Sequence, residues 1–399
     1  MTGLRRALIG IATIVALGGC ATNGPPPSGD RGGDATAPEV LEEVLAIVER
    51  DFLDPDLRGL DWLRLTDDLR TRVTDDTSDD ELRSNINELL ARLETSHTRL
   101  YTPSDPAYHA LASVFSGDVD GYPFPQIGAW FERIDGRWFV RNVFEESAAA
   151  RAGILAGDEI VSVDDRPLEP VRSFERGGPW HRIAIRREAG GPTQTIPVEV
   201  DDEESLQRTQ LRAMRASART YDRAGRTIGY AHLWSGTHEE FRRALLEAIR
   251  QLAPRSDALV LDLRDGFGGA HPGYLETLLP SDENDDVYTG PLVVLINEGT
   301  RSGKEWLAAL LARRPHTLLV GARTQGAFVA GRRYELFDGR FLLYLAVAPG
   351  PEGDGLDLEG KGVSANVRVE MPLPYRAGID AQLERALDEA AASVQESHP

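Results

Sequence analysis

The stretch that decides the fold is PLVVLINEGTRSGKE, residues 291–305, in which an apolar run ends at Asn-Glu-Gly-Thr and Ser302 opens a helical pattern. The run predicts a strand, followed by a sharp turn and a helix. A serine at such a junction projects from a rigid scaffold, and the free N–H groups of the helix start, beginning with that of Gly303, can face a developing negative charge. A second interpretation stays open, because Ser302 and Glu305 also form the S-x-x-E pattern of a helix-capping box, which implies no chemistry.

Strands and helices alternate around this junction from residue 221 onwards. An amphipathic helix is predicted after a capping box formed by Thr237 and Glu240. The apolar run at 291–298 is the strand described above. Further strands are predicted at 228–234, 257–264, 316–322 and 340–348. The pattern predicts an α/β core over 203–399, a mixed sheet with flanking helices, whose sites lie at the carboxyl ends of the strands.

A glycine-rich loop, DLRDGFGG at residues 262–269, follows one of these strands directly. Its glycines allow backbone conformations that aim N–H groups into a concavity. The loop lacks both the Lys-Ser/Thr pair of a phosphate-binding P-loop and the spacing of a dinucleotide fingerprint, so nucleotide binding is not expected. Next to a serine at the neighbouring strand end, the loop is a candidate oxyanion hole.

The start of the chain has the pattern of an export signal. Two arginines precede an uncharged run at 7–16, and Leu-Gly-Gly-Cys at 17–20 resembles a bacterial lipobox, in which Cys20 is lipidated. We therefore expect a signal peptide over 1–20, a flexible Pro- and Gly-rich tether over 21–37 and a lipid-anchored protein facing the space outside the bacterial cytoplasm. The alternatives are a plain secretory signal or an uncleaved anchor.

Composition excludes several classes of protein. The 399 residues carry a formal net charge of −20, which would repel a phosphate backbone, so nucleic acid is not an expected partner. Cys20 is the only cysteine, which excludes an intramolecular disulfide and a cysteine metal site. The histidines show no H-E-x-x-H or related spacing, so neither a metal nor another cofactor is expected.

Two further regions precede the α/β core. Apolar residues at spacings of three and four predict a small helical domain over 38–105. Short alternating runs over 113–202 predict a β-rich domain with a hairpin turn at Asp135-Gly136. Within it, SAAARAGILAGDEIVSVDDRPL at 147–168 resembles a PDZ domain, which implies a peptide partner bound as an added strand. The alternative is a β-rich spacer without an accessible groove.

Four motifs in order, DLRDGFGG, PLVVLINEGTRSGKE, LLVGARTQGAF and LEGKGVSANVRV, resemble those of the C-terminal-processing, or tail-specific, serine peptidases. The likeness covers nearly all of the chain after the signal, including a helical N-terminal piece that ends in SHTRL and the PDZ domain. The resemblance implies a polypeptide substrate and Ser302 as the nucleophile. It also implies oxyanion donors at Gly303 and at Gly268 or Gly269.

The general base departs from the commonest pattern of that family. Many members use a lysine in a Thr-x-Gly-Lys segment, and Ala327 stands at that place here. Lys304 is no substitute, because residues two apart on a helix do not share a face. The tricorn-like branch of the family instead uses a Ser, a His and a Glu. His97, in a Ser-His segment, and Glu359, just ahead of a Gly-Val segment, match the positions of the last two. An imidazole can take the serine proton, and a carboxylate can orient it.

Non-catalytic interpretations of His97 and Glu359 also remain open. His97 near a helix end is favoured by the helix dipole alone, and Glu359 in a charged loop is often only solvated. His232 and His271 are rival bases. The chain also carries Arg301 where the family usually has a small residue before the serine, and Ala-Asn at 365–366 in place of Pro-Asp. Arg301 and Lys304 could set a charge preference in the substrate cleft.

These observations predict a lipid-anchored serine endopeptidase of the cell envelope that acts through an acyl-enzyme on Ser302, with His97 as general base oriented by Glu359. The missing lysine motivates a rival from another class. In that case the chain is a catalytically inactive relative that binds peptides as an envelope adaptor.

Overall fold

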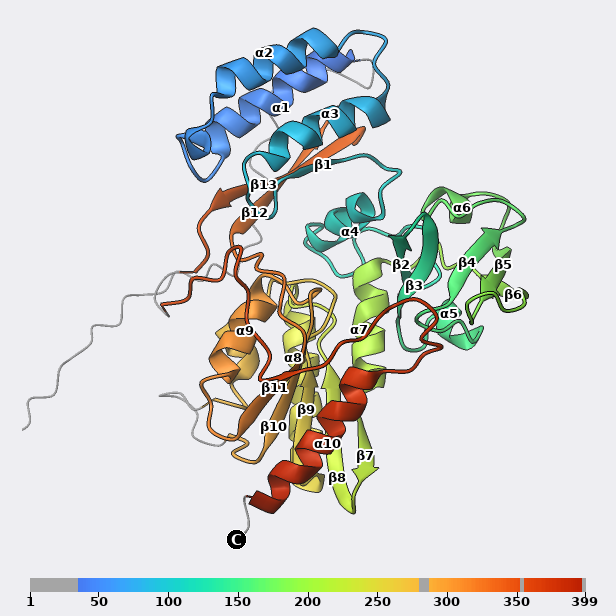
Figure 1. Ribbon diagram of the computed structural model, residues 1–399, viewed down its shortest axis with the longest axis vertical. Coiled ribbons are helices and arrows are strands. Elements are labelled where there is room, and N and C mark those ends of the chain that lie inside the picture. The colour runs from blue at the N-terminus through green and yellow to red at the C-terminus, as the bar shows by residue number, and fades with distance from the viewer. Residues whose placement is uncertain (1–34, 280–286, 352–354, 397–399) are drawn as a thin grey trace, which may run out of the picture.

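The computed structural model describes residues 35–279, 287–351 and 355–396. The predicted signal peptide, Cys20 and nearly all of the predicted tether lie outside the described residues. Within the described ranges, no helix is both long and apolar enough to cross a membrane. Three sheets organise the fold, and helices pack on each of them (Figure 1).

The largest sheet has the strand order β14-β11-β10-β9-β8-β7. Its strands are β7 (Arg219–Arg223), β8 (Arg226–His232), β9 (Ala258–Asp262), β10 (Leu292–Ile296), β11 (Thr317–Gly321) and β14 (Val367–Arg368). All neighbours pair in parallel except β7 and β8. β9 and β10 are buried along their whole length, as expected for central parallel strands covered on both faces. The predicted α/β core with a mixed sheet is confirmed.

Helices cover both faces of this sheet (Figure 1). Side chains of β10 alternate between two cores: Leu292, Val294 and Ile296 pack with the helices on one face, and Val293 and Leu295 pack with α10 on the other. The helices and short 3₁₀ turns are α7 (Leu206–Ser217), α8 (Glu239–Leu252), η2 (Ala253–Arg255), η3 (Pro272–Leu275), α9 (Gly303–Leu311) and α10 (Ala381–Glu396).

The predicted capping box before α8 is wrong. The helix begins one residue later than that pattern requires, with His238 as its N-cap and no side-chain cap. The Thr237 hydroxyl instead donates to Gln207 Oε1 at 2.8 Å, which links the start of α8 to α7. A tertiary partner therefore outcompetes the local hydrogen bond.

The β-rich region forms a five-stranded antiparallel sheet in the order β2-β3-β4-β5-β6. Asp135 and Gly136 both have positive φ, +49° and +79°, and join the first two strands in a two-residue turn, which confirms the predicted hairpin. β2 is an edge strand, so one of its sides is free to pair. The elements are β2 (Ala129–Ile134), β3 (Arg137–Val143), α5 (Ala148–Arg151), β4 (Glu159–Val163), α6 (Arg172–Glu175), β5 (Trp180–Arg186) and β6 (Gln194–Glu199).

The N-terminal helices pack on a third, three-stranded sheet in the order β1-β13-β12 (Figure 1). The strand predicted at 340–348 forms, but it belongs to this sheet and not to the large one. The helical region therefore shares its core with a hairpin from the C-terminal third of the chain. The elements are α1 (Ala37–Asp51), η1 (Leu57–Gly59), α2 (Trp62–Arg72), α3 (Asp79–Ala91), β1 (Arg99–Tyr101), α4 (Pro106–Val114), β12 (Ala330–Leu336) and β13 (Phe341–Ala348).

Candidate active site

Ser302 lies on a strained turn between β10 and α9. Its φ of +53° and ψ of −129° are unusual for a residue with a side chain, and such conformations persist only where the surroundings hold them. The Ser302 N–H donates to the carbonyl O of Ala327 at 2.9 Å and to Glu305 Oε2 at 3.0 Å. The predicted strand, turn and helix are therefore present, and Glu305 helps to cap the helix as its sequence spacing indicated.

Glu305 is the buried anchor of this turn. Besides the Ser302 N–H, its carboxylate accepts hydrogen bonds from Thr324 Oγ1 at 2.6 Å, Gly326 N at 2.7 Å and Ala327 N at 2.8 Å. The segment that carries a lysine in many tail-specific peptidases is thus wrapped around Glu305. The side chain of Ala327 is fully buried and offers no base.

The backbone of Gly268 lies against the Ser302 side chain. A Cβ atom at this position would overlap Ser302 Cβ and lie 2.9 Å from Ser302 Oγ, so only glycine leaves the hydroxyl accessible. Gly269 faces Thr237 instead, with 2.9 Å between its hypothetical Cβ and Thr237 Cγ2. Among the described residues, the N–H groups of Gly268 and Gly303 donate to no protein acceptor, which leaves both able to bind an oxyanion.

His97 and Glu359 are joined through a residue that the sequence did not single out, Ser96. The Ser96 hydroxyl donates to Glu359 Oε2 at 3.0 Å and lies 2.7 Å from His97 Nδ1, while the Ser96 N–H donates to Glu359 Oε1 at 2.8 Å. An ionised carboxylate can only accept, so the Ser96 hydroxyl donates to it and accepts from Nδ1–H. This assignment leaves Nε2 of His97 with a free lone pair.

The same short segment connects both halves of the site. Glu359 Oε2 accepts from the N–H groups of Phe328 at 2.6 Å and Val329 at 3.2 Å, and the preceding residue, Ala327, accepts from Ser302 N–H. Residues 326–329 therefore hold the serine turn on one side and the Glu359–Ser96–His97 chain on the other.

In the part of the chain that the structure describes, no hydrogen bond joins the His97 imidazole to the Ser302 hydroxyl. His97 as a whole residue is 8% exposed, and its ring centroid lies 5.2 Å from that of Tyr344. Burial, aided by the nearby charge of Arg301, lowers the pKa of His97 to about 3. At neutral pH the ring is therefore uncharged, the form that can accept a proton.

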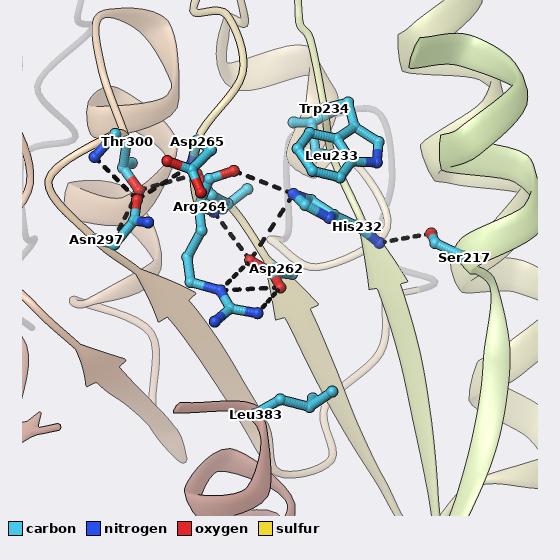
Figure 2. Close-up of polar contacts among 12 residues, drawn as sticks. Ser217, His232, Leu233, Trp234, Asp262, Arg264, Asp265, Asn297, Thr300 and Leu383 are labelled. Atoms are coloured by element: carbon cyan, nitrogen blue, oxygen red, sulfur yellow. Dashed lines mark hydrogen bonds and ion pairs between the residues drawn. The ribbon is translucent and has the colours of Figure 1, made fainter. Parts of the chain in front are cut away.

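Both rival histidines make other hydrogen bonds, and Figure 2 shows those of His232. His232 Nε2 hydrogen-bonds the carbonyl O of Arg264 at 3.0 Å, and its ring centroid lies 3.7 Å from that of Trp234. His271 Nδ1 accepts from Gly273 N–H at 3.2 Å at the start of η3. These hydrogen bonds occupy Nε2 of His232 and Nδ1 of His271, and neither histidine is joined to the Ser96–Glu359 pair that orients His97.

Below the glycine-rich loop lies a buried ion-pair network (Figure 2). The Arg264 guanidinium donates to both carboxylate oxygens of Asp262 and to Asp380 at 2.8 Å. Burial alone would raise the pKa of Asp262, but Arg264 and His232 hold it well below its usual range. Because this network starts at the end of β9, it anchors the loop that carries Gly268.

Lys304 does not face the cleft, so the expectation that it sets a charge preference there is wrong. Its side chain is fully buried, and Nζ donates to the carbonyl O atoms of Leu233 at 3.1 Å, Arg264 at 3.4 Å and Asp265. Burial lowers the pKa of this amine to about 7. Lys304 is thus a structural tie between α9, the end of β8 and the glycine-rich loop.

A pocket of about 400 Å³ lies between the five-stranded sheet and the core and comes close to the serine turn. One wall is apolar and includes Ile127, which precedes the edge strand β2, Phe131 of β2 and Phe174 of α6. The other contains Phe267 of the glycine-rich loop and Arg301, the residue before the serine. The pocket thus leads from the free strand edge towards Ser302.

Arg141 on β3 connects this sheet to the core. Its guanidinium donates to Asp265 Oδ1 at 2.8 Å, to Glu298 Oε1 at 2.9 Å and to Glu132 Oε2. Asp265 belongs to the glycine-rich loop, so an ion pair joins the two regions next to the pocket. No signal in the sequence pointed to this contact.

Within the described residues, no group of three or more His, Cys, Asp or Glu side chains could hold a metal ion.

Three family models match the chain: the peptidase family S41 model over residues 274–369, the PDZ domain model over 125–182 and the tricorn protease C1 domain model over 34–91. These matches confirm the resemblance seen in the sequence. The chain thus contains a peptidase family S41 region, a PDZ domain and a tricorn C1 region. Together with relatives named as C-terminal-processing proteases, these matches indicate a serine-peptidase hydrolase that is similar to the C-terminal-processing peptidases.

Individual relatives agree with this assignment. The chain is 26% identical to the carboxyl-terminal-processing protease of Synechocystis sp., over 90% of this chain and 88% of that protein. It is 24% identical to tricorn protease homolog 1 of Streptomyces coelicolor over 90% of this chain, but it spans only 35% of that longer protein. Among solved structures, the photosystem II D1 C-terminal processing protease matches with a TM-score of 0.54 and 21% identity, covering 87% of this chain and 99% of the other. That likeness supports the fold.

Proposed function

We propose that this chain is a serine endopeptidase that cleaves polypeptides through an acyl-enzyme on Ser302. One observation carries the proposal: the Ser302 hydroxyl lies against the backbone of Gly268, and segment 326–329 ties its turn to the chain of groups that orients His97. A nucleophile, free N–H donors and an oriented imidazole are the parts that acyl transfer needs.

In the proposed reaction, Ser302 Oγ attacks the carbonyl carbon of the scissile bond while its proton passes to His97 Nε2. The N–H groups of Gly268 and Gly303 stabilise the resulting oxyanion. The C–N bond then breaks, and the leaving amine takes the proton from His97. A water molecule gives a proton to His97 and attacks the acyl carbon, after which Ser302 regains its proton and the carboxylate product leaves.

The Glu359–Ser96 pair stabilises the imidazolium that forms during these steps. A positive charge on His97 is stabilised through the Ser96 hydroxyl by the Glu359 carboxylate. Catalytic hydrogen bonds are often absent without substrate and form in the complex. We therefore assign the contact between His97 and Ser302 to the substrate-bound state.

The PDZ domain supplies the substrate-binding surface in this proposal. The edge of β2 accepts an extended peptide as an added strand, and the apolar wall formed by Phe131 and Phe174 receives side chains. The pocket then directs the continuing chain towards Ser302. This arrangement favours an unfolded segment or a chain end over a folded protein surface.

The test combines labelling with hydrolysis. The wild type should react covalently with a fluorophosphonate at Ser302 and cleave a casein-derived peptide mixture, and both Ser302→Ala and His97→Ala should lose at least about 100-fold of the hydrolysis rate. Full hydrolysis by either variant would refute the assignment of the catalytic residues.

The adaptor function remains the second candidate, because His97 and Ser302 are not hydrogen-bonded among the described residues and Ala327 replaces the lysine of other members. It predicts tight peptide binding together with no fluorophosphonate labelling at any pH between 5 and 9. Labelling of Ser302 would exclude it.

We also propose that Cys20 carries a lipid that anchors the protein to the cell envelope. The support is the Leu-Gly-Gly-Cys segment after an apolar run. Cys20→Ser should abolish metabolic labelling with an alkyne fatty acid and move the protein to the soluble fraction. An unchanged membrane fraction would rule out the lipid anchor.

A further inference from the structure

Arg301 is a cation without a partner at the edge of the candidate active site. It is partly buried, it immediately precedes Ser302, and it lines the 400 Å³ pocket. Among the described residues its guanidinium has no ion pair and no hydrogen bond. The other arginine of the pocket, Arg141, differs sharply, because it already binds Asp265 and Glu298, the two acidic residues of the lining.

The position of this charge matters for the proposed chemistry. Arg301 is close enough to His97 to add to the effect of burial in lowering the pKa of the imidazole. Burial raises the pKa of the partly buried Tyr101 phenol, and the charge of Arg301 offsets part of that rise. A partly desolvated guanidinium gains most from a carboxylate, which it binds through two parallel charge-assisted hydrogen bonds. The pocket thus presents one unneutralised cation between the PDZ groove and the nucleophile.

We propose that Arg301 is a specificity-determining residue that binds a carboxylate of the polypeptide substrate, so that peptides with an acidic group next to the scissile bond are preferred. The carboxylate is either an Asp or Glu side chain or the C-terminal α-carboxylate. The inference rests on the proposed peptidase function of the same site. It names the substrate chemistry that the site selects.

The pairing would also act on the reaction step. A carboxylate bound to Arg301 cancels the positive charge that disfavours the imidazolium form of His97, and that form develops as Ser302 loses its proton. An acidic substrate should therefore have a higher kcat as well as a lower KM than a neutral one. A neutral substrate of the same size leaves the charge of Arg301 in place.

The test uses the wild type and fluorogenic peptides that differ only by Asp against Asn at successive positions on both sides of the cleaved bond. A second set compares a free C-terminal acid with its amide. We expect about a tenfold higher kcat/KM for the acidic member at one position or at the chain end, as one charge-assisted interaction provides. The two sets distinguish a side chain from an α-carboxylate as the source.

Variants show whether the preference belongs to Arg301. Arg301→Gln should abolish it, Arg301→Lys should keep part of it, and Arg301→Glu should favour the Asn or amide member. Arg323→Gln is the matched control, because this arginine is exposed and does not line the pocket. A wild type without acidic preference, or a preference that survives in Arg301→Gln, would overturn the inference.

A binding measurement separates this inference from the proposed function. Ser302→Ala with or without Arg301→Gln is titrated with fluorescein-labelled acid and amide peptides, which requires no catalysis. Suppose that no fluorophosphonate labels the wild type, but that Ser302→Ala binds the acid peptide about tenfold more tightly than the amide peptide. The peptidase proposal then fails, and the role of Arg301 stands. Equal binding by that variant within both peptide sets, Asp against Asn and C-terminal acid against amide, refutes the role of Arg301.

Discussion

At the scale of single residues, the least expected feature is that a hydroxyl group stands between the imidazole and the carboxylate. In a Ser-His-Asp triad the carboxylate binds Nδ1–H of the histidine directly. Here Ser96 relays that contact, and Glu359 holds Ser96 by both its N–H and its hydroxyl. The histidine tautomer therefore depends on one serine side chain.

Ser96→Ala removes the relay and should uncouple His97 from Glu359. We expect kcat to fall about 100-fold, within the usual range for impaired general-base catalysis, while KM changes less than about twofold. Ser96→Thr keeps the hydroxyl and should restore much of the activity. Thr95→Ala, which deletes a neighbouring hydroxyl that donates to Leu93 O, is the control. Equal kcat in the wild type and Ser96→Ala would contradict the relay.

Because the pKa of His97 is lowered in the folded protein, the free energy of unfolding should depend on pH. Its folded-state pKa of about 3 lies below the ordinary histidine value of 6.5, so the unfolded chain binds the proton first as the pH falls. The stability contributed by the neutral imidazole is fully present above pH 6.5 and declines towards pH 3, by up to about 1.4 kcal/mol per pH unit.

Urea unfolding at pH 7, 6, 5 and 4 should therefore show that the wild type loses more stability than His97→Asn. Asparagine has no titrating group, and it tolerates the positive φ of +59° at this position. Other titrating groups are the same in both proteins and cancel in the difference. Parallel curves for the two proteins would show that His97 does not titrate as inferred.

At the scale of elements, local patterns predicted most of what the structure contains. The apolar run at 291–296 and the helical pattern after Ser302 appear as β10 and α9, because both signals are local and agree with the burial of this region. The hairpin at Asp135-Gly136 also follows from two residues that tolerate positive φ. Serine, histidine and glutamate were chosen by resemblance, and their catalytic roles remain proposals.

The features that escaped prediction are non-local. Nothing in the run at 340–348 distinguishes a strand of the large sheet from one that pairs with β1, since either environment buries the same apolar side chains. Lys304 was expected in the cleft, but its place depends on carbonyl groups 39 to 71 positions away. The role of Ser96 required contacts across 263 positions, which spacing alone cannot reveal.

Lys304 ties three elements together, and its loss should be structural. Lys304→Met fills a similar volume but leaves the carbonyl groups of Leu233 and Asp265 without this donor, so we expect a loss of about 3 kcal/mol in unfolding free energy. Lys361→Met changes the only other lysine, which is exposed, and should shift stability by less than about 0.5 kcal/mol. Equal effects of the two variants would contradict a tie through Lys304.

At the scale of the whole molecule, the ion pair between Arg141 and Asp265 joins the five-stranded sheet to the core beside the pocket. Asp265 is buried, which alone would raise its pKa, and Arg141 more than compensates by pairing with it. A single residue on a PDZ strand therefore contacts the loop that forms the candidate oxyanion hole.

A double-mutant cycle measures this link. Arg141→Gln should destabilise the protein by about 2–3 kcal/mol, because it leaves the Asp265 carboxylate without its main partner, and adding Asp265→Asn should recover part of the loss. Arg133→Gln, on the neighbouring strand β2, is the control, because the contacts of its guanidinium, with Gly136 O at 3.4 Å and with the Trp138 ring, stay within the β2–β3 hairpin. Strict additivity of Arg141→Gln and Asp265→Asn would rule out coupling between the two regions.

The pairing of β1 with β13 also determines when the site can exist during biosynthesis. A chain made from its N-terminus contains the segment with His97 early, but β13 and Glu359 arrive only after more than 240 further residues. Until then the Ser96–His97 segment lacks both its partner strand and its carboxylate. The growing polypeptide therefore cannot assemble the candidate site until residues 341–359 have been made.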